Sequence, residues 1–115
     1  MIDQLSPTHF AAWRDAAAPV QPIVLDVREP WEVQTASAKP DGFALLHIPM
    51  QSIPARMAEL REYGTDQPIA CLCHHGVRSL QVANYLVQNG FKAVVNVQGG
   101  IEAWAQQLDR TVAQY

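Results

Sequence analysis

The sequence predicts an α/β domain with a mainly parallel sheet and helices on both faces of that sheet. Short apolar, β-branched runs alternate with segments of helical spacing along the whole chain, an order typical of parallel strands joined by crossover helices. The 115 residues fit one domain of ordinary size. No shift in composition marks a second domain, so we expect a single domain over residues 1–108 and a surface-lying tail over residues 109–115.

The first half of the chain predicts one helix and two strands. Ser6 and Pro7 suit the N-cap and first position of a helix over about residues 7–18. The run PIVLDVR, residues 22–28, is apolar and ends in charge, as in a buried strand whose carboxyl end reaches a functional face. Residues 31–42 are expected to be irregular, and FALLHIP, residues 43–49, predicts the second strand.

The second half predicts helices and strands in alternation. A buried strand is again indicated by a short apolar run, and Asn89-Gly90 is typical of the end of a helix. In order, we expect a helix within residues 53–64, a strand over 68–73, a helix from 77 to Asn89, a strand over 93–98 and a helix from 99 to 108.

Composition limits the classes of partner. The net charge of −3 and the lack of a basic run argue against nucleic acid or an acidic membrane as partner. The first residues do not resemble a secretory signal, and no segment is long and apolar enough to span a bilayer. We therefore expect a cytoplasmic protein, in which Cys71 and Cys73 are reactive or buried thiols rather than a disulfide.

The candidate site is the segment CHHGVRS, residues 73–79. Cys73 follows a predicted strand and precedes a predicted helix, which places it in the crevice beyond the carboxyl ends of the sheet. So short a link predicts a tight turn whose backbone N–H groups point inward at an anion. Gly76 then permits a positive φ or a close approach of backbone. The expected substrate-binding residues are His74, His75, Gly76, Val77, Arg78 and Ser79.

Such a cradle is expected to keep Cys73 as a thiolate, helped by the helix N-terminus and by the guanidinium of Arg78. A standing thiolate can attack the outer sulfur of thiosulfate or of a persulfide and hold that sulfur as a cysteine persulfide. Cyanide or a thiol then takes the sulfur in a second step. The expected partners are a small anionic sulfur donor and a cyanide or thiol acceptor, with a sulfur-acceptor protein as a further candidate.

Other interpretations of these residues assign different chemistry. The histidines beside Cys-x-Cys, with His47, suggest zinc, but an inward-facing nest turns its side chains outward, so no metal or cofactor is expected. His74 and His75 are expected to line the rim of the pocket. Asp26 and Arg28 are expected to pair with backbone or with each other and to shape the loop floor.

Three segments resemble the rhodanese family of sulfurtransferases. LDVREPWE (25–32) resembles its Asp-Val-Arg-Glu signature, CHHGVRS (73–79) its C-x-x-G-x-R-S loop and VQGGIEAW (97–104) its Gly-Gly-x-x-x-Trp signature. The resemblance implies a five-stranded parallel sheet flanked by helices, with Cys73 carrying the persulfide. The chain reads LLHIPMQ where the family usually has Gly-His-Ile-Pro-Gly-Ala.

The resemblance also separates sulfur transfer from related chemistry. Related phosphatases and arsenate reductases use a C-x5-R cradle, whereas Cys73 to Arg78 is C-x4-R, the shorter loop of the rhodanese type. We therefore interpret the chain as a sulfurtransferase that uses Cys73. The alternatives are a sulfur-relay or regulatory persulfide-binding module with weak turnover, and a phosphatase or arsenate reductase.

Overall fold

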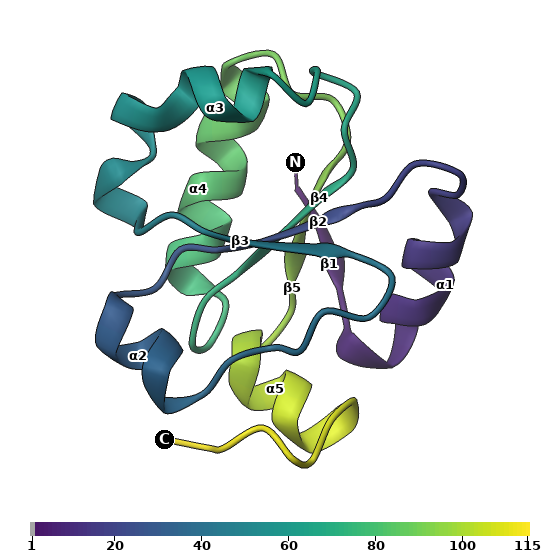
Figure 1. The fold of residues 1–115 in the computed structure, drawn as a ribbon, viewed down its shortest axis with the longest axis vertical. Helices are drawn as coiled ribbons and strands as arrows, with labels where there is room; N and C mark the ends of the chain where they lie inside the picture. The colour runs from purple at the N-terminus through teal and green to yellow at the C-terminus, as the bar shows by residue number, and fades with distance from the viewer. Residues whose placement is uncertain (1) are drawn as a thin grey trace.

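The fold is a single five-stranded sheet in which every strand runs parallel to its neighbours (Figure 1). The computed structural model describes residues 2–115. The strand order is β1-β5-β4-β2-β3. This confirms the predicted α/β class and the five strands that the family resemblance implies. The strands are β1 (Asp3–Leu5), β2 (Ile23–Asp26), β3 (Ala44–His47), β4 (Ile69–Leu72) and β5 (Val94–Val97).

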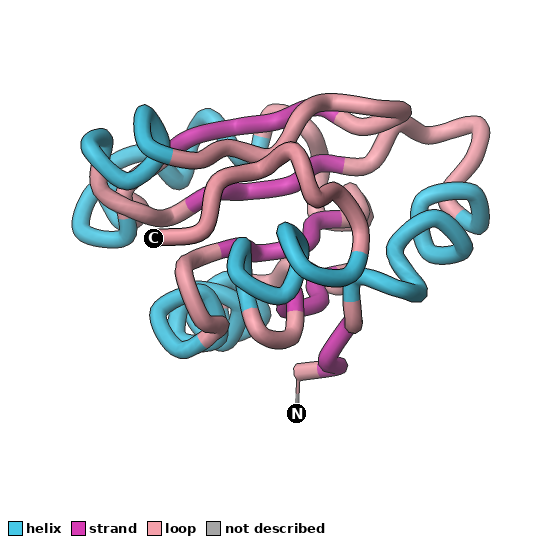
Figure 2. Tube along the Cα trace, turned by 90° about the horizontal axis from the view of Figure 1, so that it is seen from below, coloured by secondary structure: helices cyan, strands magenta, loops and turns pink. Residues whose placement is uncertain are grey.

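Helices cover both faces of the sheet (Figure 2). One core cluster joins α3 and α4 to alternate strand residues such as Leu25 and Cys71. The other joins α1 and α5 to the intervening residues, including Val24 and Leu72, because successive side chains of a strand point to opposite faces. The helices are α1 (Phe10–Ala16), α2 (Pro30–Thr35), α3 (Met57–Arg61), α4 (Val77–Gln88) and α5 (Gly100–Gln107), with 3-10 turns at Pro7–His9, Met50–Ser52 and Pro54–Arg56.

The apolar runs of the two central strands, β2 and β4, do not alternate with polar residues. Every residue of β2 and β4 is buried, since helices cover both of their faces. In the register of the sheet, Asp26 lies beside Leu72 on one side and beside His47 on the other. The carboxyl ends of β2, β3 and β4 therefore meet at the edge where the loop after Leu72 begins.

The prediction of an irregular segment over residues 31–42 is wrong at its start, where α2 forms. Pro30 occupies the first helical turn, where its missing N–H has no helical partner to lose. The Glu32 carboxylate accepts a hydrogen bond from the Glu29 N–H at 3.2 Å, which satisfies a donor at the helix end. Glu29 and Pro30, which lie shortly after the end of β2, are thus the N-cap and the first residue of α2.

Two other predicted elements differ in extent. The helix expected over residues 7–18 is a 3-10 turn followed by α1, and the segment from residue 53 divides into a 3-10 turn and the short α3. β1 has no counterpart among the runs predicted from the residues, because it is an edge strand of three residues with an exposed or half-buried pattern.

The tail over residues 109–115 turns back past α5 toward α2 (Figure 1). Most of its residues are exposed, but Val112 is buried in the cluster that contains Trp104. The Lys39 ammonium donates a hydrogen bond to Thr111 Oγ1 at 2.5 Å. These contacts bring Tyr115 to the carboxyl end of the sheet.

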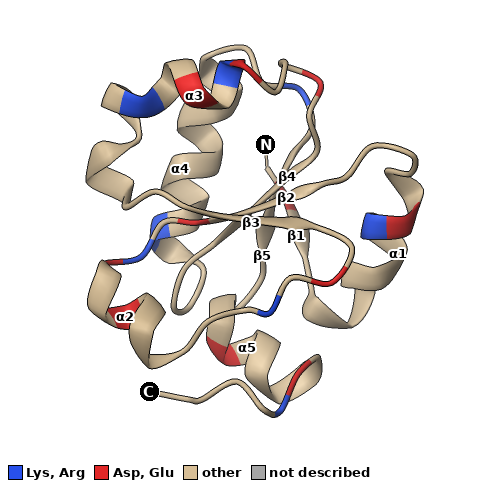
Figure 3. Cartoon of the chain, viewed as in Figure 1, with Lys and Arg blue, Asp and Glu red and all other residues tan. Residues whose placement is uncertain are grey.

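The charged residues of both signs are spread over several elements (Figure 3). In this view the Lys and Arg positions are interspersed with Asp and Glu positions. Over the same residues, none of the helices combines the length and the apolar character that crossing a membrane requires.

Candidate active site

Two backbone hydrogen bonds from the first turn of α5 hold the segment that follows β4. The Ile101 N–H donates to the Cys73 carbonyl at 2.8 Å, and the Glu102 N–H donates to the His74 carbonyl at 3.2 Å. Gly100 has φ of 63°, and a Cβ at this position would lie 2.3 Å from the His74 carbonyl oxygen. The Gly-Gly pair therefore permits a close approach of two backbones that a side chain would prevent.

The Gly76 N–H and the hydroxyl oxygen of Ser79 lie against the sulfur of Cys73, whose side chain is buried. The Gly76 N–H lies 3.1 Å from Cys73 Sγ, and the Ser79 hydroxyl oxygen lies 3.3 Å from it. Gly76 has φ of 102°, one of the two roles that the sequence allows for it, and α4 begins at the next residue. Hydrogen-bond donors and a helix N-terminus both stabilise negative charge on a cysteine sulfur.

Asn96 on β5 holds Gly76 and accepts the single hydroxyl proton of Ser79, and the sequence interpretation missed it. Its Nδ2 donates to the Gly76 carbonyl at 3.0 Å and to Gln4 Oε1 at 3.0 Å, which turns its Oδ1 to the Ser79 hydroxyl at 2.5 Å. Asn96 is only 1% exposed. A polar residue inside the apolar run AVVNVQ is a signal for such a role, because buried polar groups need partners.

Arg78 does not donate a hydrogen bond to Cys73, in contrast to the direct contribution expected from it. Its Nη1 and Nη2 instead donate to the two carboxylate oxygens of Glu32, at 2.6 Å and 2.8 Å. This ion pair raises the pKa of Arg78, and Arg78 in turn lowers the pKa of Glu32 to about 2 despite the burial of that carboxylate. Glu32 is a second residue that the sequence interpretation missed.

Asp26 and Arg28 pair with each other beneath the site. Arg28 is fully buried, and its Nη2 donates to Asp26 Oδ2 at 2.6 Å and to the Ala36 carbonyl at 2.7 Å. Burial alone would lower the pKa of Arg28, but the hydrogen bonds with Asp26 and Tyr115 outweigh burial and raise it. The pair fixes the position of α2 relative to the end of β2.

Tyr115 reaches the same network from the tail. Its hydroxyl accepts a hydrogen bond from Arg28 Nη1 at 2.9 Å and donates one to Glu32 Oε2 at 2.7 Å. Burial is the main cause that raises the pKa of Tyr115, to about 12. Its ring stacks on His74 with centroids 3.8 Å apart and planes inclined by 9°.

The two histidines stack on each other at one side of this network. Their ring centroids are 3.8 Å apart, and His75 Nε2 lies 3.3 Å from Glu102 Oε2. Burial and the neighbouring His75 lower the pKa of His74. Potential ligand atoms of His74, His75 and Glu102 lie within 4.8 Å of one another. Face-to-face imidazoles, however, direct their lone pairs side by side rather than at one point, so the arrangement does not fit a metal.

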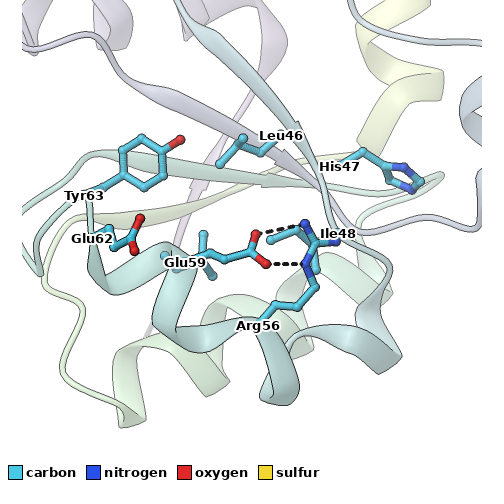
Figure 4. A pocket seen from close by; sticks show the side chains of 8 residues that line it. Leu46, His47, Ile48, Arg56, Glu59, Glu62 and Tyr63 are labelled. Carbon is cyan, nitrogen blue, oxygen red and sulfur yellow. Dashed lines mark hydrogen bonds and ion pairs between the residues drawn. The ribbon is translucent and has the colours of Figure 1, made fainter.

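His47 is separate from that group. Its Nε2 lies 2.8 Å from the Arg28 carbonyl oxygen, at the end of β3. It also lines a surface pocket of about 450 Å³ between β3 and α3, which Figure 4 shows with the Arg56–Glu59 ion pair along one side. Cys73 does not line this pocket.

Cys71 lies two residues before the nucleophile candidate and on the same face of the sheet. It is fully buried, and burial followed by the effect of Cys73 raises the pKa of its thiol. A buried, protonated thiol is a poor nucleophile. Cys71 therefore acts as a small apolar core residue.

Comparisons with known proteins show the family to which the chain belongs. The rhodanese-like domain family model matches residues 6–107. A protein named sulfurtransferase from Allochromatium vinosum is 38% identical over 84 residues, which are 73% of this chain and 72% of that protein. A protein named thiosulfate sulfurtransferase GlpE from Vibrio cholerae is 39% identical over 84 residues, 73% of each chain. The crystal structure of a rhodanese-like domain protein from Staphylococcus aureus superposes with a TM-score of 0.72 at 28% identity, covering 99% of both chains. The chain belongs to the rhodanese-like domain family.

Proposed function

We propose that this chain is a sulfurtransferase that moves a sulfane sulfur from thiosulfate or a persulfide donor to cyanide or a thiol, through a persulfide on Cys73. One observation carries the proposal: Cys73 Sγ follows a central strand and receives the Gly76 N–H at 3.1 Å beside the Ser79 hydroxyl. The Gly76 N–H can also hold the terminal sulfur of a persulfide, which is an anion as well. His74, His75, Val77 and Arg78 surround this cradle as the remaining proposed binding residues.

The chemistry is balanced without a proton transfer to the nucleophile. The Cys73 thiolate attacks the outer sulfur of thiosulfate, a new S–S bond forms, and the original S–S bond breaks with its electron pair leaving on sulfite. In the second step, cyanide attacks the terminal sulfur of the persulfide. Thiocyanate leaves, and the S–S electron pair returns to Cys73 as the thiolate. No step requires a cofactor.

The alternative functions predict different products. A sulfur-relay or regulatory module would form the same persulfide but turn over thiosulfate slowly. A phosphatase or arsenate reductase would need the site to surround a tetrahedral oxyanion. The loop from Cys73 to Arg78 is C-x4-R, one residue shorter than the C-x5-R cradle of those enzymes. Both cysteines are free thiols, which suits a reducing cytoplasm.

Intact-mass spectrometry after incubation with thiosulfate tests the proposal. We expect one added sulfur on the wild-type chain, removable by dithiothreitol, and no sulfur on Cys73→Ser. Cys71→Ser is the matched control, because it changes a buried thiol two residues away, and it should still take up sulfur. Sulfur uptake by Cys73→Ser would overturn the assignment of the nucleophile. Hydrolysis of an aryl phosphate without any sulfur uptake would overturn the transferase proposal.

A further inference from the structure

We propose that Tyr115 is a positioning residue that sets the affinity of the site for anionic sulfur donors by fixing the direction of Arg78 through Glu32. The inference rests on the proposed function and extends it to the tail. Tyr115 lies 83 residues from Glu32 in the sequence, yet its hydroxyl lies 2.7 Å from Glu32 Oε2. Tyr115 lies outside the three segments that resemble the family signatures, residues 25–32, 73–79 and 97–104.

The direction of each hydrogen bond at the Tyr115 hydroxyl is determined by its partners. A guanidinium has only donors, so the phenol oxygen must accept the bond from Arg28 Nη1. The single phenol proton is then available to the Glu32 carboxylate. Tyr115 thus links the buried Asp26–Arg28 pair to the half-buried Glu32–Arg78 pair.

This link completes the hydrogen bonding of Glu32. The carboxylate accepts two bonds from Arg78, one from the Glu29 N–H and one from Tyr115. Four bonds match the roughly four acceptor sites of an ionised carboxylate. With every site occupied, Glu32 has one orientation, and the guanidinium plane of Arg78 follows that orientation because the pairing is bidentate.

The fixed guanidinium leaves donors for a ligand. Arg78 uses one N–H of each terminal nitrogen for Glu32, which leaves its Nε–H and one further N–H on each terminal nitrogen. Its side chain is 33% exposed, and it lies in the first turn of α4, directly after Val77 and the Gly76 N–H that bonds Cys73 Sγ. These N–H groups are suited to the sulfonate oxygens of thiosulfate while its outer sulfur approaches Cys73.

The tail holds Tyr115 in place for this task. The ring stacks on His74 with centroids 3.8 Å apart and meets Trp31 edge-on with centroids 6.0 Å apart. Val112 anchors the segment in the core three residues earlier. Tyr115→Phe keeps both ring contacts and removes only the hydroxyl, and with it the bond to Glu32 and the bond from Arg28.

Steady-state kinetics with thiosulfate and dithiothreitol provide the first test. We expect Tyr115→Phe to raise KM for thiosulfate about threefold to tenfold, since the Glu32 carboxylate loses one of its four hydrogen bonds. The kcat and the rate at which dithiothreitol, a neutral acceptor, releases sulfide from preloaded protein should stay unchanged. Tyr63→Phe is the matched control, because Tyr63 lies on the wall of the pocket between β3 and α3.

A double substitution tests the route through Glu32. If Tyr115 acts through this carboxylate, Tyr115→Phe combined with Glu32→Gln should have the KM of Glu32→Gln alone. Effects that multiply would overturn the inference, as would an unchanged KM in Tyr115→Phe. A Tyr115→Phe protein that does not fold would also overturn it, because Tyr115 would then have a structural role only.

Calorimetric binding of thiosulfate to Cys73→Ser separates this inference from the proposed function. The binding should weaken by the same factor when Tyr115→Phe is added. A wild-type chain that takes up no sulfur, but whose Cys73→Ser form binds thiosulfate in a Tyr115-dependent way, would refute sulfur transfer and retain the positioning role. Binding that does not depend on the Tyr115 hydroxyl would refute the positioning role alone.

Discussion

Replacement of Gly100 by alanine should separate the α5 N-terminus from the loop that carries Cys73. The new Cβ would lie 2.3 Å from the His74 carbonyl oxygen and 2.5 Å from the Cys73 carbonyl oxygen, both of them backbone atoms. The two segments must move apart. The hydrogen bonds from the Ile101 and Glu102 N–H groups to those carbonyls, at 2.8 Å and 3.2 Å, would lengthen or break.

The expected loss of stability has two parts. A left-handed backbone costs a residue with a Cβ about 1–2 kcal/mol, offset in part by the lower chain entropy of alanine in the unfolded state. Each lost backbone hydrogen bond adds about 1 kcal/mol. We therefore expect Gly100→Ala to lower the free energy of unfolding by about 3 kcal/mol, from the combined effects of left-handed strain and two weakened bonds.

Gly90→Ala is the matched control for the backbone strain. Gly90 has φ of 98°, and a Cβ there would meet no atom within 4 Å. This variant should lose only the cost of the left-handed conformation, about 1 kcal/mol. Urea unfolding should then give midpoints for the two variants that differ by about 1 M, for a slope near 2 kcal/mol/M.

Persulfide formation provides the second measurement on the same pair. Gly90→Ala should take up sulfur from thiosulfate at the wild-type rate, whereas Gly100→Ala should take it up more slowly at a temperature where both are folded. Equal unfolding midpoints for the two variants would refute the argument that close backbone approach is what requires glycine at position 100. If the two variants had equal urea midpoints but only Gly100→Ala took up sulfur slowly, the substitution would affect the Cys73 loop without lowering the free energy of unfolding.

Two further predictions concern buried partners of the site. Ser79→Ala should lower the free energy of unfolding by about 1–3 kcal/mol, because Asn96 Oδ1 loses its hydroxyl partner. The variant should also take up sulfur more slowly. A urea midpoint equal to that of the wild type would contradict the stability prediction. Because the pKa of Glu32 falls from 4.5 to about 2 on folding, its ionised form stabilises the fold above pH 4.5, and this contribution is lost as the pH falls toward 2. The difference in free energy of unfolding between wild type and Glu32→Gln should therefore shrink by up to about 3 kcal/mol from pH 5 to pH 2. A difference that does not change with pH would show that Arg78 does not stabilise the carboxylate.

The local sequence pattern was sufficient to predict an element wherever the residues of one segment determine its structure. The fully buried strands β2 and β4 are visible as apolar runs, because a strand covered on both faces needs no polar positions. The positive φ of Gly76 follows from the shortness of the link between a strand and a helix. The start of α2 was missed because Glu29 and Pro30 are compatible with both the end of a strand and the start of a helix.

The local sequence pattern does not predict hydrogen bonds between polar residues that are distant in the chain. Arg78 was expected to act on Cys73, but Glu32, 46 residues away, takes both of its terminal nitrogens. Asn96 lies 17 residues after Ser79, and Tyr115 lies 87 residues after Arg28. A side-chain hydrogen bond has no periodicity in the sequence, so its partner is chosen only when the strands and the tail are packed.

The class of fold, the candidate nucleophile and the loop around it follow from local sequence, because hydrophobic periodicity and the place of Cys73 at a strand end are local properties. The support of that loop depends on tertiary contacts. Parallel pairing placed α5 under Cys73, and packing of Val112 carried Tyr115 to Glu32. These are long-range contacts whose geometry depends on the whole sheet, and no single segment of the chain encodes them.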